Sequence, residues 1–179
     1  MSGTLDFYPE KPDDPAEALL KDMATRRMTA GKTLALPILD FHAFKAYLEK
    51  ELADEVKKQA RLTEVAPFIR EIHIWGHGKP GYFKFGRELI GAENLKKLGT
   101  GTLGRYVKPE TTIYLKGCNA AAGDQGKTFM YQLGRIIFGG KTGYLWGNRR
   151  PVISLMGVDQ SQGDPVKYKY PTDFKQPAK

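Results

Sequence analysis

The chain has 179 residues, of which 41% are hydrophobic and 27% charged, and its net charge is +8. This length favours one domain with a core of ordinary size, and the composition excludes a disordered or fibrous protein. No apolar run approaches the roughly 20 residues of a membrane helix, and the sequence begins without a signal-peptide pattern. The single cysteine excludes an internal disulfide, so we expect a cytoplasmic protein or one exported without a cleaved signal peptide.

The net positive charge lies in the second half of the chain. Residues 1–90 contain 14 Lys and Arg against 14 Asp and Glu, whereas residues 91–179 contain 14 against 6. One interpretation is a solvated surface that net charge keeps soluble. The other is a positive surface for an acidic protein, a membrane surface or nucleic acid. Nucleic acid is the least favoured partner, because no motif of a known nucleic-acid-binding module is present.

Both ends of the chain are polar and divide it into three parts. Residues 1–31 are predicted to form a flexible N-terminal arm, in which Pro15 could start a short helix that ends near Met23. Residues 159–179 are rich in Pro, Lys and Tyr and are predicted to form a polar C-terminal tail. The domain itself is expected over residues 32–158.

Within that domain, strand and helix patterns alternate. Asp40 and Asp124 are the expected N-caps of two helices, and Pro37 suggests that its strand lies at an edge or contains a bulge. The alternation predicts an α/β fold with a mostly parallel sheet and helices on both faces. The expected strands are 32–39, 69–75, 111–116, 142–146 and 151–156, with a hairpin arm at 82–85; the expected helices are 40–60, 92–106 and 124–139.

Two of these strands end at a glycine next to a reactive side chain. The run Ile69–Trp75 is followed by Gly-His-Gly, and the run Thr111–Lys116 is followed by Gly-Cys-Asn. The carboxyl ends of parallel strands share one edge of a sheet, where α/β folds place their sites. We therefore expect His77 and Cys118 to lie near each other at this edge.

These residue types suit acyl transfer. Cys118 could act as the nucleophile and His77 as the proton acceptor and donor, while the backbone N–H groups of Gly78 and Cys118 could form an oxyanion hole. Taken singly, a cysteine at a strand end is usually a small buried hydrophobe, and Gly-His-Gly is usually a turn. A zinc site with His73 is disfavoured, because four residues of strand span about 13 Å. We expect no metal and no organic cofactor.

The same segments resemble the caspase-fold cysteine peptidases, above all bacterial members and the related domain at the start of large bacterial adhesins. The resemblance covers roughly residues 33–150, although the Gln-Ala-Cys-x-Gly signature of true caspases is absent. It rests, in chain order, on Ile72-His73-Ile74-Trp75-Gly76-His77-Gly78, on Ile113-Tyr114-Leu115-Lys116-Gly117-Cys118-Asn119, and on Gly126 and Gly143.

The resemblance implies a caspase-like three-layer sandwich and endopeptidase activity, often self-cleavage. It assigns the catalytic histidine to His77, the nucleophile to Cys118 and an oxyanion-hole glycine to Gly78. The favoured function is a cysteine endopeptidase or self-processing peptidase with a protein or peptide substrate, and a toxic bacterial effector is one setting for it. The alternative is a non-catalytic caspase-like module that binds an acidic partner through its basic C-terminal half.

A segment after the fourth expected strand could contact the substrate. The loop Trp146-Gly147-Asn148-Arg149-Arg150 follows a strand expected beside that of Cys118, so it should emerge at the same edge. Trp146 would form an apolar wall and Arg149 or Arg150 could meet an acidic substrate group. The alternative is an ordinary surface turn.

Overall fold

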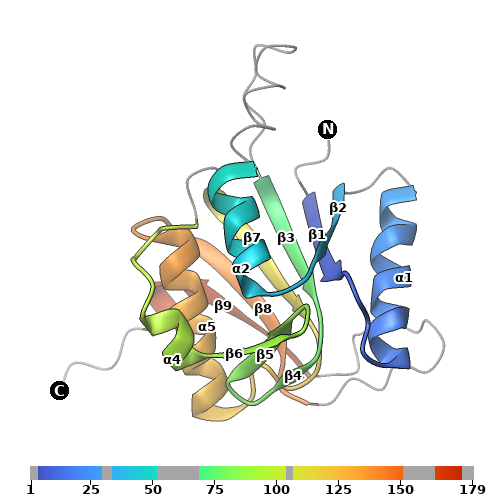
Figure 1. Ribbon diagram of the computed structural model, residues 1–179. Coiled ribbons are helices and arrows are strands. Elements are labelled where there is room, and N and C mark those ends of the chain that lie inside the picture. Colours follow the sequence, from blue (N-terminus) through green and yellow to red (C-terminus); the bar gives the residue numbers. More distant parts are fainter. Residues whose placement is uncertain (1–3, 30–33, 52–68, 104–106, 151–163, 175–179) are drawn as a thin grey trace, which may run out of the picture.

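The structure is a computed structural model that describes residues 4–29, 34–51, 69–103, 107–150 and 164–174 (Figure 1). Its centre is a six-stranded sheet in the order β2-β1-β3-β7-β8-β9. The first five of these strands run parallel, and β9 is antiparallel to β8. The predicted α/β class with a mostly parallel sheet is confirmed. The strands are β1 (Thr4–Pro9), β2 (Leu34–Ile38), β3 (Ile69–Trp75), β7 (Val107–Lys116), β8 (Gly143–Asn148) and β9 (Pro165–Tyr170).

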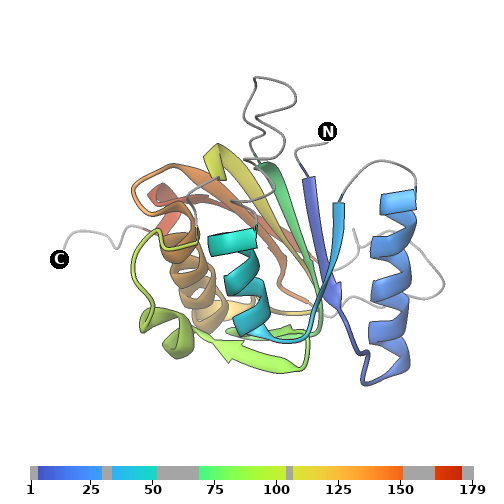
Figure 2. The ribbon, with the colours of Figure 1, turned by 45° about the horizontal axis from the view of Figure 1, so that its top comes forward.

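Helices lie on both faces of the sheet, as Figures 1 and 2 show. Two neighbours on β1 mark the faces: Asp6 bonds to Arg27 of α1, whereas the Phe7 ring packs 5.0 Å from the Phe44 ring of α2. No described helix is long and apolar enough to cross a bilayer. The first face holds α1 (Pro15–Thr29); the second holds α2 (Phe41–Ala46), which continues as the π-helix Tyr47–Glu51, then α4 (Ala92–Lys96) and α5 (Gly123–Phe138).

A small antiparallel sheet closes the core at the carboxyl edge of the main sheet (Figure 1). It consists of β4 (Gly78–Lys79), β5 (Tyr82–Phe85) and β6 (Glu88–Gly91), and so confirms the predicted hairpin. Phe83 and Phe85 are fully buried, and the Phe85 ring lies within 5.1 Å of the α2 phenylalanine rings. The hairpin therefore extends the core directly from the loop that follows β3.

Several local predictions are confirmed. β3 has the predicted bounds, and β2, which contains Pro37, lies at an edge of the sheet. Asp40 caps α2, because its carboxylate accepts a 2.8 Å hydrogen bond from the Ala43 amide. The rest of the helix predicted to reach residue 60 lies outside the described residues, as does the strand predicted at 151–156.

The prediction of a flexible N-terminal arm is wrong. Residues 4–9 form β1, which lies between β2 and β3 inside the sheet. Asp6 made this segment look polar, but the Asp6 carboxylate is fully buried and accepts hydrogen bonds from the Trp75 indole (2.7 Å) and the Arg27 guanidinium (3.1 Å). The helix that follows runs to Thr29 rather than to Met23.

The predicted polar tail is also wrong, because residues 165–170 form the edge strand β9. Its sequence Pro-Val-Lys-Tyr-Lys-Tyr alternates in burial, with Tyr170 packed against the α5 side of the sheet and the lysines exposed. A strand of this kind at an edge has one solvated face, so it resembles a tail in composition.

Three element boundaries also differ from prediction. The helix expected over 92–106 is described only as the short α4, and β7 begins at Val107 rather than at Thr111. Asp124 is not the N-cap of α5: Ala122 holds that position, and Asp124 lies in the first turn. The acidic side chain still lies at the positive end of the helix dipole.

Candidate functional site

His77 and Cys118 follow the ends of two neighbouring strands. β3 and β7 are parallel and paired, with Trp75 opposite Lys116. The ladder continues past the strands, because the Gly76 amide donates a 3.3 Å hydrogen bond to the Lys116 carbonyl. His77 and Cys118 each lie two residues past this last pair, at the carboxyl edge of the sheet. The two residues therefore follow the same ends of two neighbouring strands, and a contact between their side chains stays a prediction.

Glycines allow the two loops to touch. A Cβ atom on Gly78 would overlap the carbonyl oxygen of Cys118, and one on Gly117 would overlap the carbonyl oxygen of Gly76. The Gly78 amide also makes no hydrogen bond to β5 of the small sheet. The Lys84 amide donates a hydrogen bond to the His77 carbonyl. Gly78 and Phe83 are therefore a non-hydrogen-bonded pair of this antiparallel ladder. The Gly78 N–H group, which lies beside the Cys118 backbone, can therefore donate to an acceptor outside this ladder.

Asp14, at the start of α1, holds the His77 ring. Its Oδ2 lies 2.9 Å from His77 Nε2, while its Oδ1 accepts a 2.9 Å hydrogen bond from the Glu17 amide. The hydrogen bond from the Glu17 backbone and the contact with His77 lower the pKa of Asp14 despite some desolvation. The carboxylate is therefore ionised at neutral pH and fixed from two sides. Sequence reasoning missed this residue, because it lies 63 positions before the histidine.

A buried ion pair fixes the same helix end to β5. The Glu17 side chain is fully buried, and the Lys84 ammonium lies 2.8 Å from it and 2.7 Å from Asp13. Burial alone would lower the pKa of Lys84, but the hydrogen bonds to these two carboxylates outweigh it and raise the pKa. Strand β5 thereby positions the helix end that contacts His77.

The same cluster has the residue types of a metal site. Ligand atoms of Asp14, Glu17 and His77 lie within 4.8 Å of one another. The Lys84 ammonium already neutralises Glu17, so an entering cation would have to displace it. The chemistry of this donor set therefore favours an ion-pair network over a metal centre.

His73, weighed above as a zinc ligand, lies in a different network. It is buried within β3, where Nε2 is 3.3 Å from Glu71 and 3.5 Å from Arg27, and its ring stacks on Tyr114. Burial lowers the pKa of His73, and Arg27 and Lys116 act in the same direction, while Asp6 and Glu71 oppose them. This histidine belongs to the contact between α1 and the sheet.

The predicted substrate loop lies at the correct edge, but part of it is strand. Trp146 and Asn148 belong to β8, so the turn begins only at Arg149. Asn148 is fully buried and donates a 3.0 Å hydrogen bond to the Gly117 carbonyl, so its predicted contact with substrate is wrong. It supports the loop that contains Cys118 instead. Arg149 and Arg150 are exposed, and both pair with Asp164, at 3.0 and 3.9 Å.

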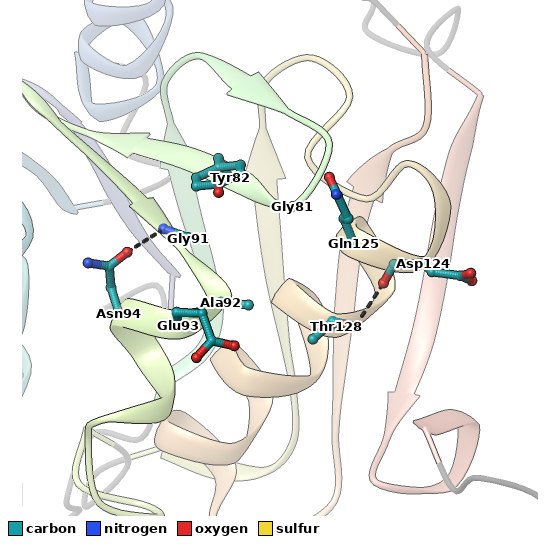
Figure 3. A pocket seen from close by; sticks show the side chains of 9 residues that line it. All are labelled: Gly81, Tyr82, Gly91, Ala92, Glu93, Asn94, Asp124, Gln125 and Thr128. Carbon is teal, nitrogen blue, oxygen red and sulfur yellow. Dashed lines mark hydrogen bonds between the residues drawn. The ribbon is translucent and has the colours of Figure 1, made fainter.

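A pocket of about 370 Å³ lies where the small sheet meets the start of α5 (Figure 3). Tyr82 forms one wall, and the exposed Glu93 and Asp124 give the pocket an acidic rim. Neither His77 nor Cys118 belongs to its lining. The lining residues are Gly81, Tyr82, Gly91, Ala92, Glu93, Asn94, Asp124, Gln125 and Thr128.

Comparison with known proteins gives one result. The family described as "Domain of unknown function (DUF4347)" matches residues 43–139, a range that includes β3, β7 and both candidate catalytic residues. No curated protein and no solved structure matches the chain.

Proposed function

The chain belongs to this family of unknown function, and we propose that it is a cysteine endopeptidase, or a self-processing peptidase, with a Cys118–His77 dyad. The observation that supports the proposal most is the parallel pairing of β3 with β7, because His77 and Cys118 each follow the last paired residue of these strands by two positions. A caspase-like sandwich is the finer fold we propose, on the order and context of the His-Gly and Cys segments.

The reaction would proceed through an acyl-enzyme. The Cys118 thiol transfers its proton to His77, and the sulfur forms a bond to the substrate carbonyl carbon. The peptide C–N bond then breaks, and the leaving amine takes the proton from His77. A water molecule, deprotonated by the same imidazole, then attacks the thioester carbonyl carbon. The C–S bond breaks, the carboxylic acid product leaves, and His77 returns the proton to the Cys118 sulfur. Each step conserves protons, since His77 accepts one and returns one.

The oxyanion that forms in each attack needs donors in the loops. The Gly78 amide is suited to this role, because it lies against the Cys118 backbone and makes no hydrogen bond within the β4–β5 ladder. The Cys118 amide is the second proposed donor. The loss of a single oxyanion-hole donor typically reduces kcat about 10²- to 10³-fold.

Asp14 supplies the third group of the proposed machinery. A hydrogen bond donated from His77 Nε2 to the Asp14 carboxylate leaves the lone pair on Nδ1 for the thiol proton. The carboxylate also stabilises the imidazolium that forms after proton transfer. Asp14 is thus a positioning residue, which acts through His77 and not on the substrate.

Cleavage of a random peptide mixture, followed by mass spectrometry, tests the function. The wild-type protein should generate new peptide termini, or cleave itself, and Cys118→Ala should do neither. His77→Ala should reduce the rate about 10²- to 10⁴-fold, as expected when general acid–base catalysis is lost. Equal rates in all three proteins would eliminate the peptidase and favour a binding module.

A further inference from the structure

Among the described residues, helix α1 is the one helix on its face of the main sheet, and it lies over only part of that face. Helix α1 packs against β1, β2 and β3, and no other described helix lies on this face over β7, β8 and β9 (Figures 1 and 2). The strand alternation turns aromatic and basic side chains toward this side, while Ile113, Leu115 and Leu145 enter the core on the other. We call the part over which no described helix lies the aromatic–lysine face; it consists of Tyr114, Lys116, Tyr144, Trp146, Lys167 and Lys169.

Lysine ammonium groups lie over the aromatic rings of this face. The Lys116 Nζ is 4.8 Å from the Trp146 ring centroid and 5.0 Å from that of Tyr114. The Lys167 Nζ is 4.1 Å from the Tyr144 ring centroid. These cation–π contacts hold the two lysine ammonium groups in place above the aromatic rings. Because these lysine side chains are already held in position, they lose little conformational entropy when they bind an anionic group.

The charge balance of the face is positive. Three lysines belong to it, and among the described residues of β3 the acidic side chain at its border is Glu71, which lies 3.3 Å from His73. Asp173 lies beyond the end of β9, where its carboxylate accepts from the Lys169 amide and not from the lysine side chain. The uneven charge of the sequence is therefore concentrated, in part, on a sheet surface with aromatic flanks.

We propose that the aromatic–lysine face binds an acidic segment of a partner protein. Its lysines would meet the carboxylates of the bound segment, and its rings would hold these lysines in position. Single-stranded nucleic acid fits less well, because bases stack on open ring faces, and here the lysine ammonium groups occupy them. The Tyr114 and Trp146 rings are also tilted by 51° to each other. The proposal is independent of the dyad.

Binding can be measured by fluorescence anisotropy with a labelled dodecapeptide of alternating Glu and Thr residues. The protein is the full chain with Cys118→Ala, so that cleavage cannot affect the result. We expect saturable binding in low salt that weakens strongly toward about 0.5 M salt, since the Debye length shrinks from about 10 Å at 0.1 M to 3 Å at 1 M. A peptide with Lys in place of Glu should not bind.

Matched variants locate the site. Lys167→Glu with Lys169→Glu should raise Kd at least about tenfold, and Trp146→Ala about fivefold, because it removes the ring over which Lys116 lies. Lys97→Glu with Lys127→Glu makes the same change in net charge at exposed positions elsewhere and should have little effect. Equal loss in both charge pairs would overturn the proposal. So would the absence of peptide binding, or tighter binding of a dodecathymidylate that Trp146→Ala abolishes.

Discussion

Asp14 is the residue through which α1 acts on the proposed dyad, and Asp14→Asn tests that action. The substitution removes the negative charge 2.9 Å from His77 Nε2. The amide oxygen can still accept the hydrogen bond from the Glu17 amide that caps the helix, so α1 should remain in place. Asp14→Ala would lose both functions and would not separate them.

The expected magnitude follows from the distance and the exposure. Two unit charges 2.9 Å apart interact by about 1.4 kcal/mol in bulk water, or a factor of about ten in rate. The side chains of His77 and Asp14 are 40% and 44% exposed, so solvent and salt screen the pair. We therefore expect kcat to fall about three- to tenfold, while KM stays unchanged because Asp14 does not touch the substrate.

Steady-state kinetics on a peptide substrate measure both constants. Asp13→Asn is the matched control: it removes the neighbouring carboxylate, which pairs with Lys84 and not with His77. That variant should keep the wild-type kcat. An unchanged kcat in Asp14→Asn, or the same loss in Asp13→Asn, would refute the role assigned to Asp14.

Three further predictions concern the structure around the site. Gly78→Ala should displace the Cys118 loop and abolish cleavage, whereas Gly140→Ala, with no atom within 4 Å of the new methyl group, should behave as wild type in the same assay. Lys84→Met leaves a buried carboxylate unpaired and should lower the free energy of unfolding in urea by about 3 kcal/mol; an unchanged midpoint would contradict the buried pair. Burial lowers the pKa of His73 in the folded protein, so that as pH falls this histidine is protonated in the unfolded chain before it is protonated in the folded one. The free energy of unfolding should therefore decline as pH falls below about 6.5. Thermal unfolding at several pH values should show that Tm declines less steeply with falling pH in His73→Gln than in the wild type. The control His42→Gln, at an exposed position, should show the same decline as the wild type.

The parts of the fold that were predictable are those whose cause is local. β3 contains three isoleucines and a tryptophan within seven residues and is followed at once by Gly-His-Gly, and its bounds were predicted correctly. β1 was missed because Asp6 interrupts it; its partners Trp75 and Arg27 are 69 and 21 residues away, and no local pattern shows that they compensate its burial. β9 was missed because an edge strand with one wet face has the composition of a tail.

The candidate site divides in the same way. His77 and Cys118 were predictable, because strand ends and the rule for parallel sheets place them at one edge. Asp14 was not, since its contact depends on how α1 crosses the sheet. Asn148 was assigned to a loop, but two more residues of strand bury it beneath Gly117. Nor could the aromatic–lysine face be predicted, as it is assembled from three strands.

The central claim is that Cys118 is a nucleophile served by His77, and labelling of the single cysteine tests it most directly. A peptide with a thiol-reactive electrophile is added to the folded protein, and intact mass reports the labelled fraction. We predict stoichiometric labelling of the wild type, labelling at least about a hundredfold slower in His77→Ala, and equal, slow labelling of both proteins after unfolding. Equal labelling rates in the folded wild type and folded His77→Ala would contradict the dyad.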